Sequence, residues 1–273
     1  DEQEKLNLLG HYYGQYMATV LENQIMLNEN GANSQAILVN NNTERVQTLS
    51  GRIPSRFAIH EKDEHIALFY KRSEHNDNAL LILDHENEVI SELAGLGIDE
   101  SIYSSRFFED TAYLVTFREI DPLYAIDISN IREPKLLSEL KIPGFSNYLH
   151  VMNENYLLGI GMSGNSWWGG RGEVSLYDTQ DLDHVKKIDS VLLPGYSDGY
   201  ISGHQSILKH ENYIVYKSYE DTYVLKLDGN RLRLWDQITN DSSSSDFLIK
   251  DHSLLIIDKG STMKIALEAD IID

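Results

Sequence analysis

The residues best suited to bind a ligand are arginines, histidines and aromatic side chains that open short apolar strands. Two segments begin with Ser-Arg-Phe, at Arg56 and Arg106, and the equivalent positions further along hold Tyr148, His150 and His204. A guanidinium binds carboxylates and phosphates through paired hydrogen bonds. The pattern indicates a cationic and aromatic ring around an anion. The alternative is that each arginine pairs with one of the 43 acidic residues.

A glycine-rich insertion at residues 162–172 is the second candidate binding segment. It carries two adjacent tryptophans, Trp167 and Trp168, and then Arg171. The insertion connects the second and third strands of its repeat, and Arg118 lies in the corresponding connection of the preceding repeat. Adjacent aromatic rings stack on sugars and anchor protein partners. The alternative is a loop that only packs against the body of the protein.

Motifs for catalysis and for metal binding are missing from the sequence. There are no cysteines, no Gly-x-Ser-x-Gly nucleophile elbow and no His-x-x-x-His pair among the 10 histidines. We therefore assign no catalytic residue and no metal ligand. Residues 178–183 and 228–230 offer acidic oxygens but do not match an EF-hand loop, so calcium is the one cofactor that the sequence leaves open.

The composition restricts the partners. The chain has 23 basic and 43 acidic residues, a net charge of −20, which argues against binding nucleic acid or anionic lipid. No apolar run approaches the ~20 residues of a membrane helix, so we expect no membrane insertion in this segment. With 41% apolar residues the chain can bury a sizeable core. We expect the protein to be a monomer.

A repeat of about 40–50 residues organises the whole chain and is typical of a β-propeller. Six copies of an apolar hairpin occur, and their second strands begin near positions 24, 65, 112, 156, 213 and 253. A third strand follows in every copy and a fourth in five. Residues 4–10 resemble a fourth strand. The sequence predicts one all-β domain over residues 1–273, a six-bladed β-propeller with four-stranded antiparallel blades, closed by the N-terminal strand.

The strands of the third and fourth repeats also carry a resemblance to a known family. Residues 112–118, 121–129, 134–137, 139–146 and 148–150 resemble secreted bacterial proteins with a C-terminal β-propeller distantly related to WD repeats. The Gly-His and Trp-Asp dipeptides of WD repeats are not in register here. The resemblance implies a propeller in a secreted or extracytoplasmic setting, such as the cell surface. It implies no established reaction and no catalytic residue.

These features favour a non-catalytic binding or interaction scaffold whose partner is a protein, a glycan or an anionic ligand. The alternative is an enzyme acting on a carbohydrate or lactone, with a metal at the mouth of the channel. In an up-and-down blade, the connections after the second and fourth strands share one face. We expect the ligand on that face, because the hairpin turns on the other face are short and acidic.

Overall fold

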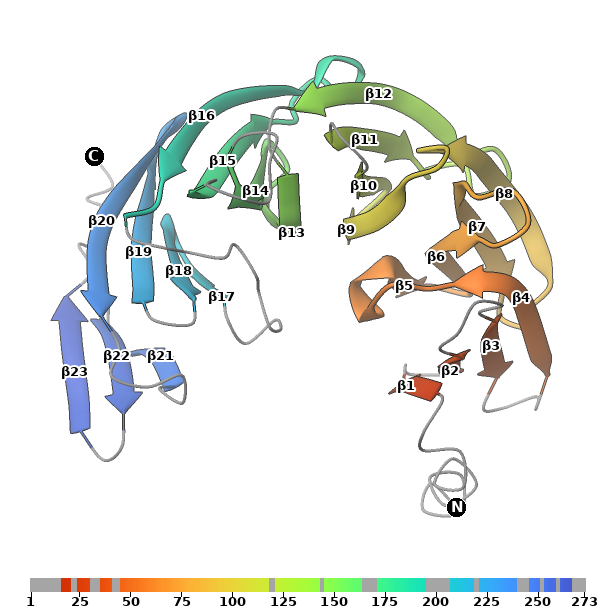
Figure 1. Cartoon of the computed structure of the whole chain (residues 1–273), viewed down its shortest axis with the longest axis horizontal. Helices are drawn as coiled ribbons and strands as arrows, with labels where there is room; N and C mark the ends of the chain where they lie inside the picture. Colours follow the sequence, from red (N-terminus) through yellow and green to blue (C-terminus); the bar gives the residue numbers. More distant parts are fainter. Residues whose placement is uncertain are drawn as a thin grey trace. The chain divides into compact units, whose positions relative to one another are not determined.

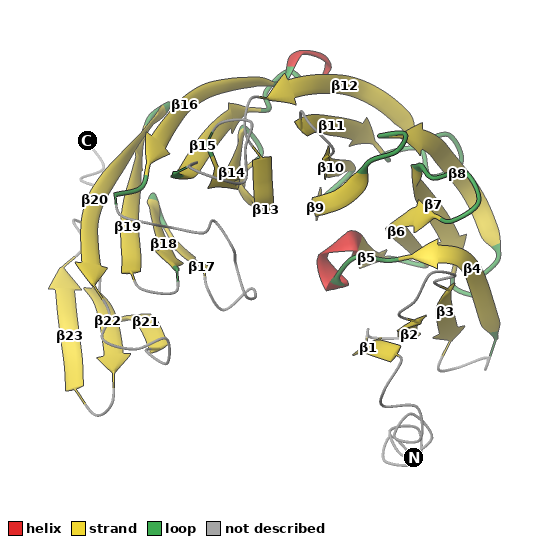
Figure 2. Cartoon of the chain, viewed as in Figure 1, coloured by secondary structure: helices red, strands yellow, loops and turns green. Residues whose placement is uncertain are grey.

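The structure is a computed structural model that describes residues 16–20, 24–29, 35–40, 45–117, 121–142, 145–163, 171–194, 207–218, 221–239, 246–250, 253–258 and 261–266. The described residues are almost entirely β (Figure 2). They include two single-turn 3-10 helices, η2 (Arg56–Ala58) and η3 (Leu182–His184). No helix in these residues is long and apolar enough to cross a membrane.

The strands repeat in groups of four along the chain (Figure 1). The first strands are β1 (Tyr16–Val20), β5 (Ile59–Lys62), β9 (Ser101–Phe108), β13 (Phe145–Asn153), β17 (Ile207–His210) and β21 (Asp246–Lys250). The second strands are β2 (Gln24–Glu29), β6 (His65–Arg72), β10 (Thr111–Phe117), β14 (Tyr156–Met162), β18 (Tyr213–Lys217) and β22 (Ser253–Asp258). The third strands are β3 (Gln35–Asn40), β7 (Asn78–Asp84), β11 (Asp121–Asp127), β15 (Gly172–Asp178), β19 (Asp221–Asp228) and β23 (Ser261–Ala266). The fourth strands are β4 (Val46–Arg52), β8 (Val89–Leu96), β12 (Lys135–Ile142), β16 (Lys186–Leu192) and β20 (Arg231–Thr239).

Each group forms an antiparallel meander, which confirms the predicted four-stranded units. In the described residues β1–β4, β5–β8, β9–β12, β13–β16 and β17–β20 are such units, and β21–β23 form a three-stranded sheet. The first two units are also joined, because Gly51 and Arg52 at the end of β4 pair with Arg72 and Lys71 of β6. Residues 4–10, expected to supply the last fourth strand, lie outside the described residues.

The chain divides into two compact units, residues 1–141 and residues 142–273. In the first unit one apolar core runs from Ala36 in β3 through β6 and β7 to Ile128 after β11. In the second unit a core cluster joins Tyr213 of β18 and Val224 of β19 to Leu254 of β22. Each core therefore connects more than one sheet.

Burial explains why the second and third strands are so apolar. In β6, β7 and β10 five or six consecutive residues are buried, so both faces of these strands are covered. Such strands appear as continuous apolar runs rather than alternating ones. The fourth strands β4 and β8 are mostly exposed or half-buried. These second and third strands are thus covered on both faces, whereas the fourth strands are not.

The acidic hairpin turns behave as the sequence predicts. Asp63, Glu109 and Glu211 adopt left-handed backbone angles, with φ of 52°, 49° and 50°. Neighbouring turns of the first unit contact one another: Lys62 Nζ lies 2.7 Å from Asp110 Oδ1. The turn at Arg45 similarly pairs with Glu86 and Glu88 of the next sheet.

One local prediction is wrong. Ser55-Arg56-Phe57 does not open a strand; it forms the 3-10 turn η2, and β5 begins at Ile59. The Ser55 side chain accepts a hydrogen bond from the Phe57 N–H at 3.3 Å. Pro54 precedes this turn, and a proline cannot donate to a strand ladder. The equivalent Ser105 and Arg106 have no preceding proline and lie within a strand, although β9 begins four residues earlier than predicted, at Ser101.

Candidate functional site

Two predicted site residues of the first unit lie around one aromatic ring. The Arg106 Cζ atom lies 3.9 Å from the centroid of the Phe57 ring, and the Arg56 Cζ atom lies 5.8 Å from the same centroid. The η2 turn contacts β9, which is why positions 50 residues apart in the sequence meet here. Arg56 is exposed and forms no ion pair with any described residue. The structure thus brings two guanidinium groups together on a neutral, half-buried ring.

A stack of three rings adjoins this cluster. His60 of β5 lies parallel to Phe107 of β9, with ring centroids 5.3 Å apart, and Phe69 of β6 lies 5.2 Å from Phe107. His60 Nε2 is buried without a hydrogen-bond partner among the described residues. Burial lowers the pKa of His60, and repulsion from Lys62 and His65 lowers it further. This imidazole therefore favours its neutral form and behaves as a packing residue.

Contacts in the first unit show that a connection after a second strand and a connection after a fourth strand lie on the same face. The β6–β7 connection meets the β8–β9 connection where the Asp99 N–H donates to the Asn76 carbonyl at 2.8 Å. Asn76 Nδ2 also donates to Asp99 Oδ1 at 2.6 Å, and Lys71 Nζ donates to the Glu100 carbonyl at 2.7 Å. These connections follow a second and a fourth strand respectively, as the predicted ligand face requires.

In the second unit, Tyr148 and His150 form a pair on one face of β13. Their ring centroids are 6.3 Å apart with an interplanar angle of 18°. Residues two apart on a strand point to the same side of the sheet, which accounts for the pairing. Tyr148 is buried and His150 is half-buried. The two arginines and this ring pair belong to different units.

Arg171 supports the base of the glycine-rich insertion. Its backbone N–H donates to Ser163 Oγ at 3.1 Å, and its carbonyl accepts from the Ser163 N–H at 2.8 Å. Its Nη2 donates to the Leu193 carbonyl at 3.4 Å. The side chain therefore holds the loop base against the end of the fourth strand. The other predicted site residues lie outside the described residues: Arg118, Trp167, Trp168 and His204.

The candidate calcium oxygens are used by the local backbone. Asp178 Oδ1 accepts from the Gln180 N–H, and the Asp181 side chain accepts from the Asp183 N–H and contacts His184 Nδ1. The described residues contain no group of three or more acidic or histidine side chains arranged to hold a metal ion. Calcium binding stays a prediction.

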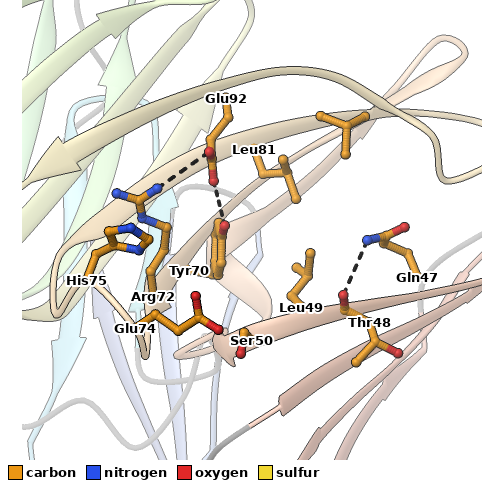
Figure 3. A pocket seen from close by; sticks show the side chains of 11 residues that line it. Gln47, Thr48, Leu49, Ser50, Tyr70, Arg72, Glu74, His75, Leu81 and Glu92 are labelled. Carbon is orange, nitrogen blue, oxygen red and sulfur yellow. Dashed lines mark hydrogen bonds and ion pairs between the residues drawn. The ribbon is translucent and has the colours of Figure 1, made fainter.

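A pocket between β4 and the sheet β6–β8 was missed by the sequence reasoning (Figure 3). Its volume is about 320 Å³. It is lined by four residues of β4, by the end of β6, by the first half of β8, by Leu81 of β7 and by the β6–β7 connection. The lining residues are Gln47, Thr48, Leu49, Ser50, Tyr70, Arg72, Glu74, His75, Leu81, Val89 and Glu92.

A hydrogen-bonded network forms one wall of this pocket. The Tyr70 hydroxyl donates to Glu92 Oε1 at 2.5 Å, and Arg72 Nη1 lies 3.6 Å from Glu92 Oε2 (Figure 3). Behind it, Arg72 donates to both oxygens of Asp77, at 2.7 and 2.5 Å, and the Gly95 N–H donates to the same carboxylate at 2.8 Å. The Arg72 guanidinium holds the pKa of Asp77 below its ordinary value. Arg72 is thus held in place by two carboxylates.

The sequence holds only a weak signal for this pocket. Arg72 and Asp77 flank a polar connection between two apolar strands, so an ion pair across the connection is foreseeable. Leu49 and Ser50 lie more than 20 residues earlier, and their approach depends on the contact of one sheet with the next. Gly51 makes that contact close, because a Cβ atom there would lie 2.1 Å from the Lys71 carbonyl oxygen.

Repeated four-stranded meanders with buried middle strands and exposed fourth strands define the β-propeller class. Residues 40–246 match the family described as "Beta propeller domain", and the chain belongs to that family. An uncharacterized protein from Archaeoglobus fulgidus is 36% identical over 165 residues, which are 60% of this chain and 26% of the relative. Uncharacterized protein MJ1554 from Methanocaldococcus jannaschii is 33% identical over 193 residues, 68% of this chain and 30% of the relative. The chain spans less than a third of either relative.

Solved structures share the fold at low sequence identity. BamB from Moraxella catarrhalis is 12% identical with a TM-score of 0.55, over 90% of this chain and 70% of that chain. Apo AztD from Citrobacter koseri is 11% identical with a TM-score of 0.53, over 93% of this chain and 72% of that chain. These similarities support the propeller architecture.

Proposed function

We propose that this chain is a non-catalytic binding or interaction scaffold in an extracytoplasmic setting. In this proposal residues 1–273 form one six-bladed propeller, and residues 4–10 supply the fourth strand of the last blade. The regular meanders and the family match support the propeller part. The setting outside the cytoplasm rests on the resemblance to secreted bacterial proteins.

The ligand group that we propose is an anion, a carboxylate or a phosphate, bound beside Phe57. The observation that carries this proposal is the convergence of Arg56 and Arg106 on that ring in a protein of net charge −20. A guanidinium stacked on an aromatic face keeps the N–H groups in its plane for an acidic partner. Arg56 is the contact residue in this proposal, because it is exposed and lies in no ion pair with the described residues.

A titration of the protein with inorganic phosphate and with a short peptide bearing a free C-terminal carboxylate tests this site. We expect saturable binding of at least one probe by calorimetry, weakened several-fold in Arg56→Gln. The matched control is Arg132→Gln, which removes an exposed arginine from the β11–β12 connection on the face of the hairpin turns. The proposal is wrong if the wild type binds neither probe, or if Arg132→Gln weakens binding as much as Arg56→Gln.

Glycan binding at Trp167 and Trp168 is a separate part of the proposal. Stacking of a sugar on either ring changes its fluorescence, whereas Trp235 lies in β20, is 41% exposed and serves as an outer reference. A saturable change with a glycan panel should disappear in the double variant Trp167→Ala, Trp168→Ala. A change that survives in this variant assigns the glycan to another site and contradicts the proposal.

A further inference from the structure

We propose that the pocket between β4 and β6–β8 binds an alkylammonium group, meaning a cationic amine on a short aliphatic stem. Such a group occurs in the lysine side chain of a peptide and in a free diamine. The site is separate from the anion site at Arg56, and the two proposals stand or fall independently.

The charges that line the pocket favour a cation. Arg72 and Asp77 form a neutral pair, because both oxygens of Asp77 accept hydrogen bonds from the guanidinium. The carboxylates of Glu92 and Glu74 are then left as the excess charge of the lining. Glu74 is exposed and forms no ion pair with any described residue. Two carboxylates at one opening attract an ammonium group, whose three donors suit them.

The same arrangement disfavours an anion. The only arginine in the lining, Arg72, already contacts two carboxylates, and its side chain is 18% exposed. An incoming carboxylate or phosphate would have to displace Asp77, which also accepts the Gly95 N–H. Repulsion from Glu74 and Glu92 would add to that cost.

The apolar part of the lining fits an aliphatic stem. Leu49 and Leu81 are buried side chains in the wall of the pocket, while Val89 is 55% exposed beside them. An alkyl chain placed along these residues would cover Val89 and remove apolar surface from water. A sugar fits less well, because Tyr70 is the only Tyr, Phe or Trp of the lining and is 7% exposed.

The size of the pocket limits the ligand. Its volume of about 320 Å³ lies at the small end of the ligand sites in proteins, which run from roughly 300 to 1,000 Å³. A single lysine side chain or a five-carbon diamine is in proportion to it. The Tyr70 hydroxyl and the Arg72 guanidinium keep Glu92 oriented, so one of the two carboxylates is held in place before the cation arrives.

Titration of the folded protein with 1,5-diaminopentane, followed by calorimetry and by the backbone amide NMR signals of β4 and β8, tests the proposal. We expect saturable binding with shifts confined to these strands and to the β6–β7 connection. Pentanoate has a similar stem and the opposite charge, and it should not bind there. The shorter 1,3-diaminopropane should bind more weakly, because it covers less of Val89.

The discriminating variant is Glu74→Gln, which removes an exposed charge and leaves the network at Arg72 intact. We expect binding about fivefold weaker, the loss typical of one contact between charges near water. The matched control is Glu64→Gln, an exposed glutamate in the β5–β6 hairpin on the opposite face. An equal loss in Glu64→Gln would show that the diamine responds only to the overall negative charge, and the proposal would be wrong.

A second pair of probes distinguishes the two sources of the amine. These are the capped tripeptide acetyl-Gly-Lys-Gly-amide and its analogue with norleucine in place of lysine. Binding of the lysine peptide in preference to the norleucine peptide supports a protein or peptide partner, and binding of the diamine alone supports a small-molecule ligand. If neither amine binds, or if pentanoate binds as well as the diamine, the proposal is overturned.

Discussion

The ion pair between Arg72 and Asp77 offers a sharp test of what stabilises the sheet β5–β8. The Asp77 side chain is 6% exposed and that of Arg72 is 18% exposed. Replacing Asp77 with Asn keeps the volume and removes the charge. The Arg72 guanidinium would then keep Glu92 as its acidic neighbour, with 3.6 Å between Arg72 Nη1 and Glu92 Oε2. Breaking a buried pair in this way costs about 3–5 kcal/mol when both groups are fully buried.

Because Arg72 is partly exposed and keeps a second acidic neighbour, we expect the loss in Asp77→Asn to be about 2–3 kcal/mol. Urea unfolding followed by far-ultraviolet circular dichroism should show a midpoint lower by about 1 M. The control Asp63→Asn makes the same chemical change at an exposed hairpin position with φ of 52°, a backbone angle that Asn tolerates. We expect its stability to change by less than about 0.5 kcal/mol.

The pH dependence follows from the direction of the pKa shift. The pKa of folded Asp77 is held below the ordinary value of 3.8, mainly by the Arg72 guanidinium. Its contribution to stability is therefore present above about pH 4 and is lost as the pH falls through the folded pKa. The difference in stability between the wild type and Asp77→Asn should shrink below pH 4. An equal difference at pH 3 and pH 7, or no loss at pH 7, would refute the ion-pair reasoning.

Three further predictions concern the half-buried His60, the glycine at position 51 and the closure of the propeller by residues 1–10. The pKa of His60 in the folded protein lies below 6.5, so the wild type should lose stability as the pH falls below about 6.5. The melting temperature of His60→Phe should therefore depend less on pH between pH 5 and pH 7. A pH dependence equal to that of the wild type would contradict the neutral, packed role of His60. Gly51→Ala places a Cβ atom 2.1 Å from the Lys71 carbonyl oxygen and should lower the free energy of unfolding in urea by about 1–3 kcal/mol. The control Gly229→Asn has a φ of 61° and open space around the Cβ position, so its stability should change by less than about 1 kcal/mol. Equal effects of the two glycine substitutions would argue against a close contact at Gly51. Deleting residues 1–10 should lower the melting temperature, because each apolar side chain that the added strand buries contributes roughly 1.5–3 kcal/mol; an unchanged melting temperature would disprove closure by this strand.

The sequence by itself determined the repeating β architecture. Continuous apolar runs such as residues 79–83, repeated along the chain between turn residues, indicate middle strands of a covered sheet. Acidic turns such as Asp63 and Glu109 suit left-handed hairpin positions. Both signals are local, since they depend on the conformation and burial of neighbouring residues. They therefore located the strands of the meanders, and the described structure agrees.

Tertiary structure alone decided what those strands bring together. Ser55-Arg56-Phe57 and Ser105-Arg106-Phe107 have the same local sequence, yet the first forms a 3-10 turn and the second a strand, and the two meet around Phe57. The pocket likewise joins Leu49 to Tyr70 and Glu92 across two sheets. Such contacts depend on how one sheet packs against the next, as the close approach of Gly51 to Lys71 shows. Local sequence patterns contain no record of that packing, because it is set by side chains far apart in the chain.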